Sequence, residues 1–154
     1  PDVTAVVQIG VASDRWQYIH RIGRTARAGK AGVGYLLLSE CERPFLTLIA
    51  DLPLKHRAPL APAAARKFLP SLSVARAELP HELLVESYKA WLGFYNTARS
   101  SAALGWSKEE MVLHAATFAR AVLGLGSPPR IPDADLLKMG LLGSAGLADL
   151  PGSV

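Results

Sequence analysis

Two short apolar runs on either side of one helical segment most restrict the fold of this chain. The first run extends from Thr4 to Val11 and is rich in valine, and the second covers Val33 to Leu38. Runs of this length and composition are typical of strands buried on both faces of a sheet. Ser13 and Asp14 can cap a helix over about 15–25. The order strand, helix, strand predicts a βαβ unit with parallel strands, and therefore an α/β fold.

A second helix is expected after these strands, from about Glu40 to Leu52. Its apolar residues share one stripe, namely Phe45, Leu48, Ile49 and Leu52. Prolines then recur through an alanine-rich stretch, which can hold only short helices. They are Pro53, Pro59, Pro62, Pro70 and Pro80. We therefore expect an α/β part over residues 1–54, with a boundary near 54–62, and a Pro/Ala-rich connector over residues 55–79.

The remaining residues have the pattern of a helical extension over 80–139. Four residues at helical spacing predict an amphipathic helix from Pro80 to Ala98, and they are Leu84, Tyr88, Trp91 and Tyr95. Ser107 and Glu110 form a capping box for a helix that runs to about Leu123. Residues 140–154 contain four glycines and predict a loosely packed tail.

The composition excludes several classes of protein. Of the 154 residues 50% are hydrophobic and 19% charged, and Cys41 is the one cysteine, which argues against disorder and against a disulfide scaffold. No apolar run is long enough to span a membrane. Potential ligands have no metal-site spacing, and Asp133 and Asp135 are interpreted as helix caps. The formal charge of +4 permits nucleic-acid binding.

The segment from Tyr18 to Lys30 carries the candidate chemistry. Arg21, Arg24 and Arg27 follow one another at intervals of three residues, where the predicted helix ends. A forked guanidinium suits a phosphate. The alternative is structural, because basic residues near a helix C-terminus also interact favourably with the helix dipole.

The sequence His20-Arg21-Ile22-Gly23-Arg24-Thr25-Ala26-Arg27 resembles motif VI of the DEAD-box RNA helicases, H-R-I-G-R-[TS]-[GA]-R. The likeness extends to Tyr18-Ile19 before it and to Ala28-Gly29-Lys30-x-Gly32 after it. The resemblance implies that the chain up to about Leu52 is the end of the second RecA-like domain. It also implies that motif V lies immediately upstream of Pro1.

The resemblance implies a role for each motif residue. Arg27 is expected to be the arginine finger that reaches the γ-phosphate of ATP, with Arg24 as a second γ-phosphate ligand. Such fingers stabilise charge in the transition state. His20 is expected to couple ATP to RNA through the other RecA-like domain. Arg21 has a less defined role, for which structural ion pairing is the alternative, and Gly23 is expected to serve packing.

Residues 88–95 and 137–147 resemble the helical C-terminal extension of fungal mitochondrial DEAD-box RNA chaperones. That subgroup implies RNA contacts, for which the candidates are Arg66, Lys67, Arg76 and Lys89, and a location in the mitochondrial matrix, with the cytoplasm or nucleus as alternatives. Trp91, Phe94, Tyr95 and Trp106 are predicted to be core residues rather than base-stacking ones. We expect Tyr88, Trp91 and Tyr95 to dock the extension on the sheet domain.

The chain has no Walker-type phosphate loop and no Asp-Glu-Ala-Asp motif. We therefore expect a C-terminal helicase fragment that is inactive alone. Its ATP and Mg²⁺ would be held mainly by an N-terminal RecA-like domain in cis, and RNA would be its partner, with no membrane. Two alternatives stay open: a non-catalytic RNA-binding or protein-interaction module that retains motif VI, and a basic helical domain with a chance motif.

Overall fold

The computed structural model describes residues 3–27, 29–59 and 61–147. The chain divides into two compact units. The first extends to Leu54 and includes Thr97–Gly105, and the second contains Lys55–Asn96 and the residues from Trp106 onward. Residues 148–154 of the predicted tail lie outside the described residues. So do Pro1 and Asp2, which were expected to follow motif V.

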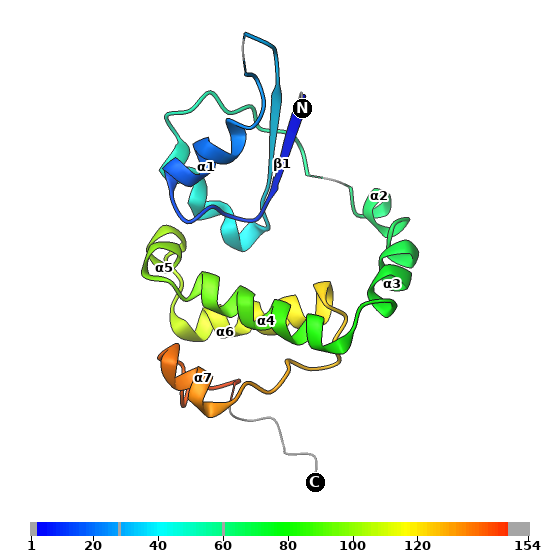
Figure 1. The fold of residues 1–154 in the computed structure, drawn as a ribbon, viewed down its shortest axis with the longest axis vertical. Helices are drawn as coiled ribbons and strands as arrows, with labels where there is room; N and C mark the ends of the chain where they lie inside the picture. Colours follow the sequence, from blue (N-terminus) through cyan, green and yellow to red (C-terminus); the bar gives the residue numbers. More distant parts are fainter. Residues whose placement is uncertain (1–2, 28, 60, 148–154) are drawn as a thin grey trace. The chain divides into compact units, whose positions relative to one another are not determined.

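The first unit contains a two-stranded parallel sheet (Figure 1). Strand β1 (Ala5–Ile9) pairs with β2 (Val33–Leu37), with Ala5 opposite Val33 and Ile9 opposite Leu37. Helix α1 (Arg15–Ile22) connects the two strands. The βαβ order confirms the predicted α/β class.

Helix α1 begins and ends at recognisable local signals. The Asp14 carboxylate accepts a hydrogen bond from the Gln17 amide at 2.9 Å, which confirms Asp14 as the N-cap. The helix ends at Ile22 rather than near Thr25. The Arg24 and Thr25 amides donate to carbonyls three residues back, so the chain tightens into a turn there.

The core of the first unit lies between α1 and the helix after β2. Tyr18 is buried and packs edge-on against Phe45, with ring centroids 6.2 Å apart. The buried Gln8 side chain donates from Nε2 to the Tyr18 carbonyl at 3.5 Å. At the surface, Arg15 binds Asp51 through two hydrogen bonds, and this guanidinium lowers the pKa of the Asp51 carboxyl.

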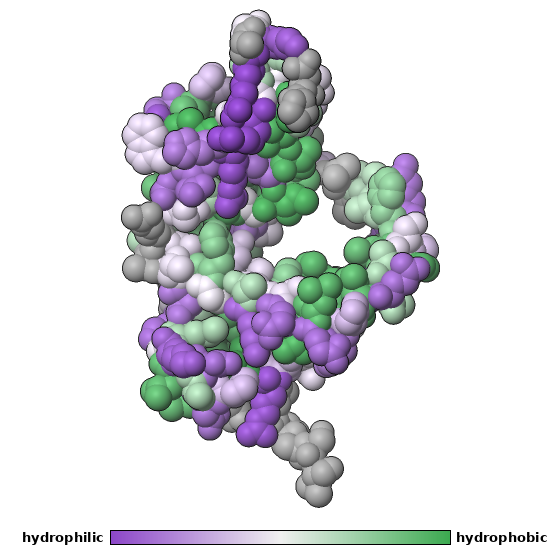
Figure 2. All heavy atoms as spheres, in the orientation of Figure 1, coloured by the Kyte–Doolittle hydropathy of each residue, from purple (hydrophilic) through white to green (hydrophobic). Residues whose placement is uncertain are grey.

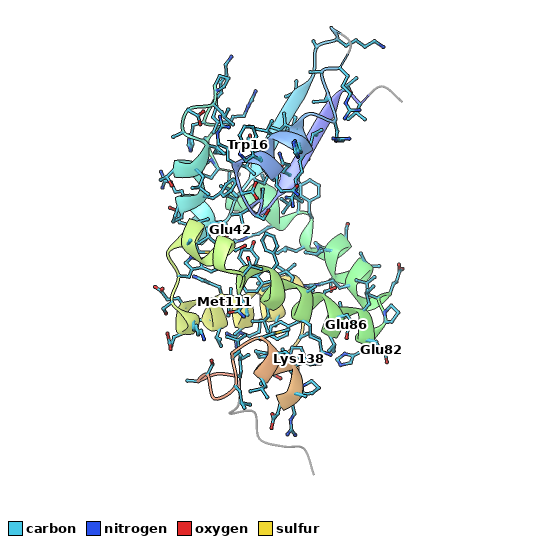
Figure 3. All side chains as sticks on the ribbon, turned by 60° about the vertical axis from the view of Figure 1, so that its left-hand side comes forward. Trp16, Glu42, Glu82, Glu86, Met111 and Lys138 are labelled. Atoms are coloured by element: carbon cyan, nitrogen blue, oxygen red, sulfur yellow. The ribbon has the colours of Figure 1, made fainter. Side chains whose placement is uncertain are left out.

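Helix η1 (Glu40–Ile49) is a 3₁₀ helix. We expected a helix from Glu40 to about Leu52, and Pro44, which has no amide hydrogen, accounts for part of the difference. The Glu42 carboxylate, labelled in Figure 3, accepts hydrogen bonds from the amide and the hydroxyl of Ser39. Phe45 and Ile49 of the predicted stripe are buried, whereas Leu48 is exposed.

Helix α5 (Ala98–Leu104) packs against η1 and belongs to the first unit. Its start is capped locally, because the Ser100 amide donates to the Thr97 hydroxyl oxygen at 3.2 Å. Leu104 is buried. A segment from within the predicted extension therefore completes the α/β unit.

The second unit is entirely helical within its described residues. It consists of α2 (Pro62–Arg66), α3 (Leu69–Ala77), α4 (His81–Tyr95), α6 (Lys108–Thr117), the π-helical turn η2 (Phe118–Val122) and α7 (Asp133–Lys138). Helices α4 and α6 lie side by side (Figure 1). The predicted capping box is present, because the Glu110 amide donates to the Ser107 hydroxyl oxygen and the Glu110 carboxylate accepts from the Ser107 amide.

A cluster of aromatic rings joins α4 to α6. Trp91 lies 4.2 Å from Tyr95 and 5.6 Å from Phe118 between ring centroids, and Trp106 lies 5.3 Å from Tyr95. Tyr88 and Tyr95 are buried, and Trp91 is half-buried. The rings are thus packed, as expected. Their observed neighbours belong to the second unit, whereas we expected this stripe to dock on the sheet domain.

Helix α7 is held by polar contacts from α4 and α6. Asn96 Nδ2 donates to the Met139 carbonyl at 2.6 Å, and Lys108 Nζ donates to the Gly140 carbonyl at 2.8 Å. A chain of charged groups also links α4 to α7, and Figure 3 labels its ends, Glu86 and Lys138. Its members are Glu86, Lys89, Asp135 and Lys138.

Candidate phosphate-binding site

The candidate site lies where α1 ends and the chain turns back towards β2. Gly23 caps α1, and its amide donates to the Ile19 carbonyl at 2.8 Å. A Cβ on Gly23 would lie 3.2 Å from that same carbonyl oxygen, which leaves little room for a side chain. The predicted packing role of Gly23 is consistent with this close approach.

Arg24 and Arg27 are fixed to the last turn of α1 by the same kind of contact. Arg24 Nε donates to the His20 carbonyl at 3.2 Å, and Arg27 Nε donates to the Gly23 carbonyl at 2.8 Å. Each arginine thus binds the carbonyl four residues back. Because Nε is used in this way, the Nη groups are the donors that a phosphate would meet.

Both arginines line one small pocket, of about 50 Å³, together with Lys30. The other lining residues are Val3, Thr4, Ala26 and Ala31. The described residues of the lining thus bring together three cations and no carboxylate. Such a set favours an anion, and a volume of this size suits a single phosphate oxygen cluster rather than a whole nucleotide.

Lys30 was not assigned a role from the sequence, although it stands in the segment that resembles motif VI. Its lysine chemistry and its distance of three residues from Arg27 were the available signals. The Lys30 amide donates to the Arg27 carbonyl at 3.1 Å, so a turn brings the lysine back beside the arginine.

His20 and Arg21 lie in the last turn of α1 and are exposed. Arg21 Nη1 lies 3.5 Å from the Val11 carbonyl, which accepts its hydrogen bond. Neither residue lines the pocket. The coupling role of His20 and any catalytic role of Arg21 stay predictions.

The four RNA-binding candidates lie in the second unit and have different surroundings. Arg66 and Lys67 are exposed, and Lys67 lies 5.3 Å from the Phe68 ring centroid. Arg76 binds two main-chain carbonyls, and Lys89 pairs with Glu86 and Asp135. The surface over α2 and α3 mixes green apolar and purple hydrophilic spheres (Figure 2). Their RNA contacts stay predictions.

Among residues 3–27, 29–59 and 61–147, no group of three or more His, Cys, Asp or Glu side chains is arranged to hold a metal ion. In the same part of the chain, every helix is too short or too polar to cross a lipid bilayer.

A cationic pocket at the end of a βαβ unit defines the first unit as an α/β module suited to binding an anion. No protein-family model matches the chain, and no solved structure matches it. Curated proteins match it over nearly its whole length. DEAD-box ATP-dependent RNA helicase 31 of Arabidopsis thaliana is 42% identical over 147 residues, which cover 96% of this chain and 20% of that protein.

Two further relatives give the same result. DEAD-box ATP-dependent RNA helicase 31 of Oryza sativa subsp. japonica is 43% identical over 96% of this chain and 26% of its own length. The probable DEAD-box ATP-dependent RNA helicase 48 of Arabidopsis thaliana is 40% identical over 96% of this chain and 18% of its own length. The chain is therefore a homologue of the DEAD-box ATP-dependent RNA helicases and spans about a fifth of their length.

The similarity covers the helical second unit as well as the motif, so these plant helicases share both parts. The three relatives are plant proteins, and the likeness to a fungal mitochondrial subgroup stays a prediction.

Proposed function

We propose that this chain is the part of an ATP-dependent RNA helicase that supplies the arginine finger for ATP hydrolysis. Arg27 would contact the γ-phosphate in the transition state, and Arg24 would bind the same phosphate. The observation that carries the proposal is their common pocket, with both Nε groups bonded to α1 carbonyls. The homology to named ATP-dependent RNA helicases supports it.

In this proposal the α/β unit is the end of a RecA-like domain, and a second RecA-like domain in cis holds the nucleotide and its Mg²⁺. His20 would lie at the interface between the two domains. RNA would be the macromolecular partner, and unwinding would follow from ATP-dependent closure of the two domains on RNA. The motif resemblance and the names of the relatives support these statements.

The pocket arginines would act mainly on the rate of the chemical step. Negative charge on the phosphoryl oxygens is redistributed as the transition state forms, and a guanidinium already held in place stabilises it without reorganising. Removal of an arginine finger in phosphoryl-transfer enzymes costs about three to five orders of magnitude in turnover. ATP binding itself would depend more on the other domain.

RNA-stimulated ATP hydrolysis by the full-length protein that carries these residues tests the proposal. Arg27→Ala should lower kcat by about 10³-fold while changing KM for ATP little. Arg43→Ala is the control, because Arg43 is an exposed arginine that pairs with Glu40 and does not line the pocket. Equal losses in kcat and in ATP affinity would mean that Arg27 binds only ground-state ATP.

The test also addresses the second candidate class. If the wild-type full-length protein binds RNA and hydrolyses no ATP, the chain belongs to a non-catalytic RNA-binding module that retains the motif. A mitochondrial matrix location is a further part of the proposal, supported by the resemblance of residues 88–95 and 137–147 alone. Import of the full-length protein into isolated mitochondria would test it.

A further inference from the structure

Thr25 lies between the two pocket arginines and is buried, with 5% of its surface exposed. Its hydroxyl donates a hydrogen bond to the main-chain carbonyl of Val3, which precedes β1. A buried hydroxyl that has a partner fixes its own backbone, because breaking the bond leaves a desolvated polar group. The segment that carries Arg24 and Arg27 is thus attached to the sheet at the residue between them.

Gly32, which precedes β2, lies directly against Thr25 from the other strand. A Cβ on Gly32 would be 2.2 Å from the Thr25 hydroxyl oxygen and 2.6 Å from the Ala26 amide nitrogen. No side chain fits at these distances. The Val33 amide also donates to the Thr4 carbonyl at 3.0 Å, so the two strand starts that enclose Thr25 are bonded to each other.

Ala26, the next residue, has a backbone conformation that must be maintained by its surroundings. Its φ is +55°, in the left-handed region that costs a residue with a side chain about 1–2 kcal/mol. Thr25 and Gly32 supply the contacts on one side of this residue. The backbone reversal at Ala26 lets Arg24 and Arg27 line the same pocket.

We propose that Thr25 is a positioning residue for the pocket arginines. Its hydroxyl, bonded to Val3 and enclosed by Gly32, sets where Arg24 and Arg27 lie relative to each other and to the bound phosphate. Thr25 does not itself line the pocket, so it acts through the arginines. This inference rests on the proposed ATP hydrolysis. Misplacement of a reacting group by about 1 Å can cost about 10²-fold in rate.

The test measures kcat and KM for RNA-stimulated ATP hydrolysis in three variants of the full-length protein. Thr25→Val keeps the shape and removes the donor, and Thr25→Ser keeps the donor. Thr47→Val is the matched control, because Thr47 also donates its hydroxyl to a carbonyl, that of Pro44 at 2.8 Å, on a helix away from the pocket.

Thr25→Val should lower kcat by about 10- to 100-fold with KM for ATP unchanged. It should also weaken binding of ADP with aluminium fluoride, which mimics the transition state, more than binding of a non-hydrolysable ATP analogue. Thr25→Ser should restore kcat, and Thr47→Val should match the wild type. The melting temperature of each variant is measured alongside.

Wild-type kcat in Thr25→Val, in a protein where Arg27→Ala is impaired, overturns the positioning role and leaves the proposed function intact. An inactive wild type overturns the proposed function instead. If Thr25→Val does not fold, Thr25→Ser decides, because a folded serine variant with a large loss of kcat shows that the hydroxyl is not what matters.

Discussion

Arg76 lies directly against Gly124, since a Cβ on that glycine would be 3.1 Å from Arg76 Cζ. From this position Arg76 Nη1 donates to the carbonyl oxygens of Ala121 and Val122, at 3.1 and 3.2 Å. The carbonyls at the end of a helix lack helical partners, and a guanidinium there satisfies them. Arg76 therefore joins α3 to the end of η2, a structural contact for a residue predicted to bind RNA.

Gly124→Ala should destabilise the second unit for two reasons. The φ of Gly124 is +71°, which disfavours a side chain, and the added methyl group would displace Arg76. We expect a loss of about 1–2 kcal/mol in the free energy of unfolding, measured by tryptophan fluorescence in urea. Gly126→Ala is the control, because a Cβ there meets nothing within 4 Å, and an equal loss in both variants would contradict the explanation.

The RNA-binding candidates should separate by the same kind of measurement. Arg66→Ala with Lys67→Ala should weaken RNA binding by the full-length protein at low salt and flatten its salt dependence, with unfolding unchanged, because both side chains are exposed. Arg76→Ala should instead lower the melting temperature. Unchanged melting in Arg76→Ala together with weaker RNA binding would make Arg76 an RNA contact.

Tyr88 should make the stability of the second unit fall at high pH. Its side chain is fully buried, its hydroxyl has no hydrogen-bond partner among the described residues, and burial raises its pKa to about 12. An unfolded tyrosine ionises near pH 10. Above that pH the unfolded state loses its proton first, so the free energy of unfolding decreases by about 1.4 kcal/mol per pH unit until about pH 12.

Urea unfolding from pH 7 to 11 in Tyr88→Phe checks this dependence. The variant should lose less stability above pH 10 than the wild type, and at pH 7 it should be at least as stable, because an unpaired buried hydroxyl has been removed. Tyr35→Phe, at an exposed strand position, is the control. Parallel curves for wild type and Tyr88→Phe would show that the Tyr88 hydroxyl does not cause the loss.

Trp91→Ala should destabilise the second unit by about 3 kcal/mol, because the ring packs against Tyr95 and Phe118. Trp16→Ala is a useful control, since Trp16 on α1 is 66% exposed (Figure 3). Thermal unfolding and RNA binding are compared in both. Intact melting with lost RNA binding in Trp91→Ala would identify a base-stacking surface instead of a packed cluster.

Local signals in the sequence predicted much of the fold. Asp14 as an N-cap, the Ser107 and Glu110 capping box, and the two valine- and leucine-rich strands all act over a few neighbouring residues, so a single sequence displays them. The two arginines of the pocket were also predicted, because motif VI is a contiguous segment.

Contacts between distant residues could not be predicted in this way. Helix α5 has a short Ala- and Ser-rich sequence without a distinctive apolar stripe, so nothing local indicated that it packs on η1. The partner of Arg76 lies 45 residues away along the chain. The fit of Gly32 against Thr25 likewise depends on the return of the chain to the sheet, which a glycine in a loop does not reveal.

The last prediction concerns the bare face of the sheet. Strand pairing places Val7 opposite Tyr35 and Ile9 opposite Leu37, so these four side chains share one face. All four are exposed, Ile9 by 81%. Parallel sheets normally have both faces covered, and an exposed apolar sheet with open edges favours association between copies.

The isolated 154-residue chain should therefore self-associate, with a sedimentation coefficient that rises with protein concentration. Ile9→Lys with Leu37→Lys should reduce this association, because opposed charges of one sign on that face repel a second copy. Leu113→Lys, an equally apolar and exposed change on α6, is the control and should have little effect. A monomer at all concentrations, with a sharp and reversible thermal transition, would show that this face needs no cover.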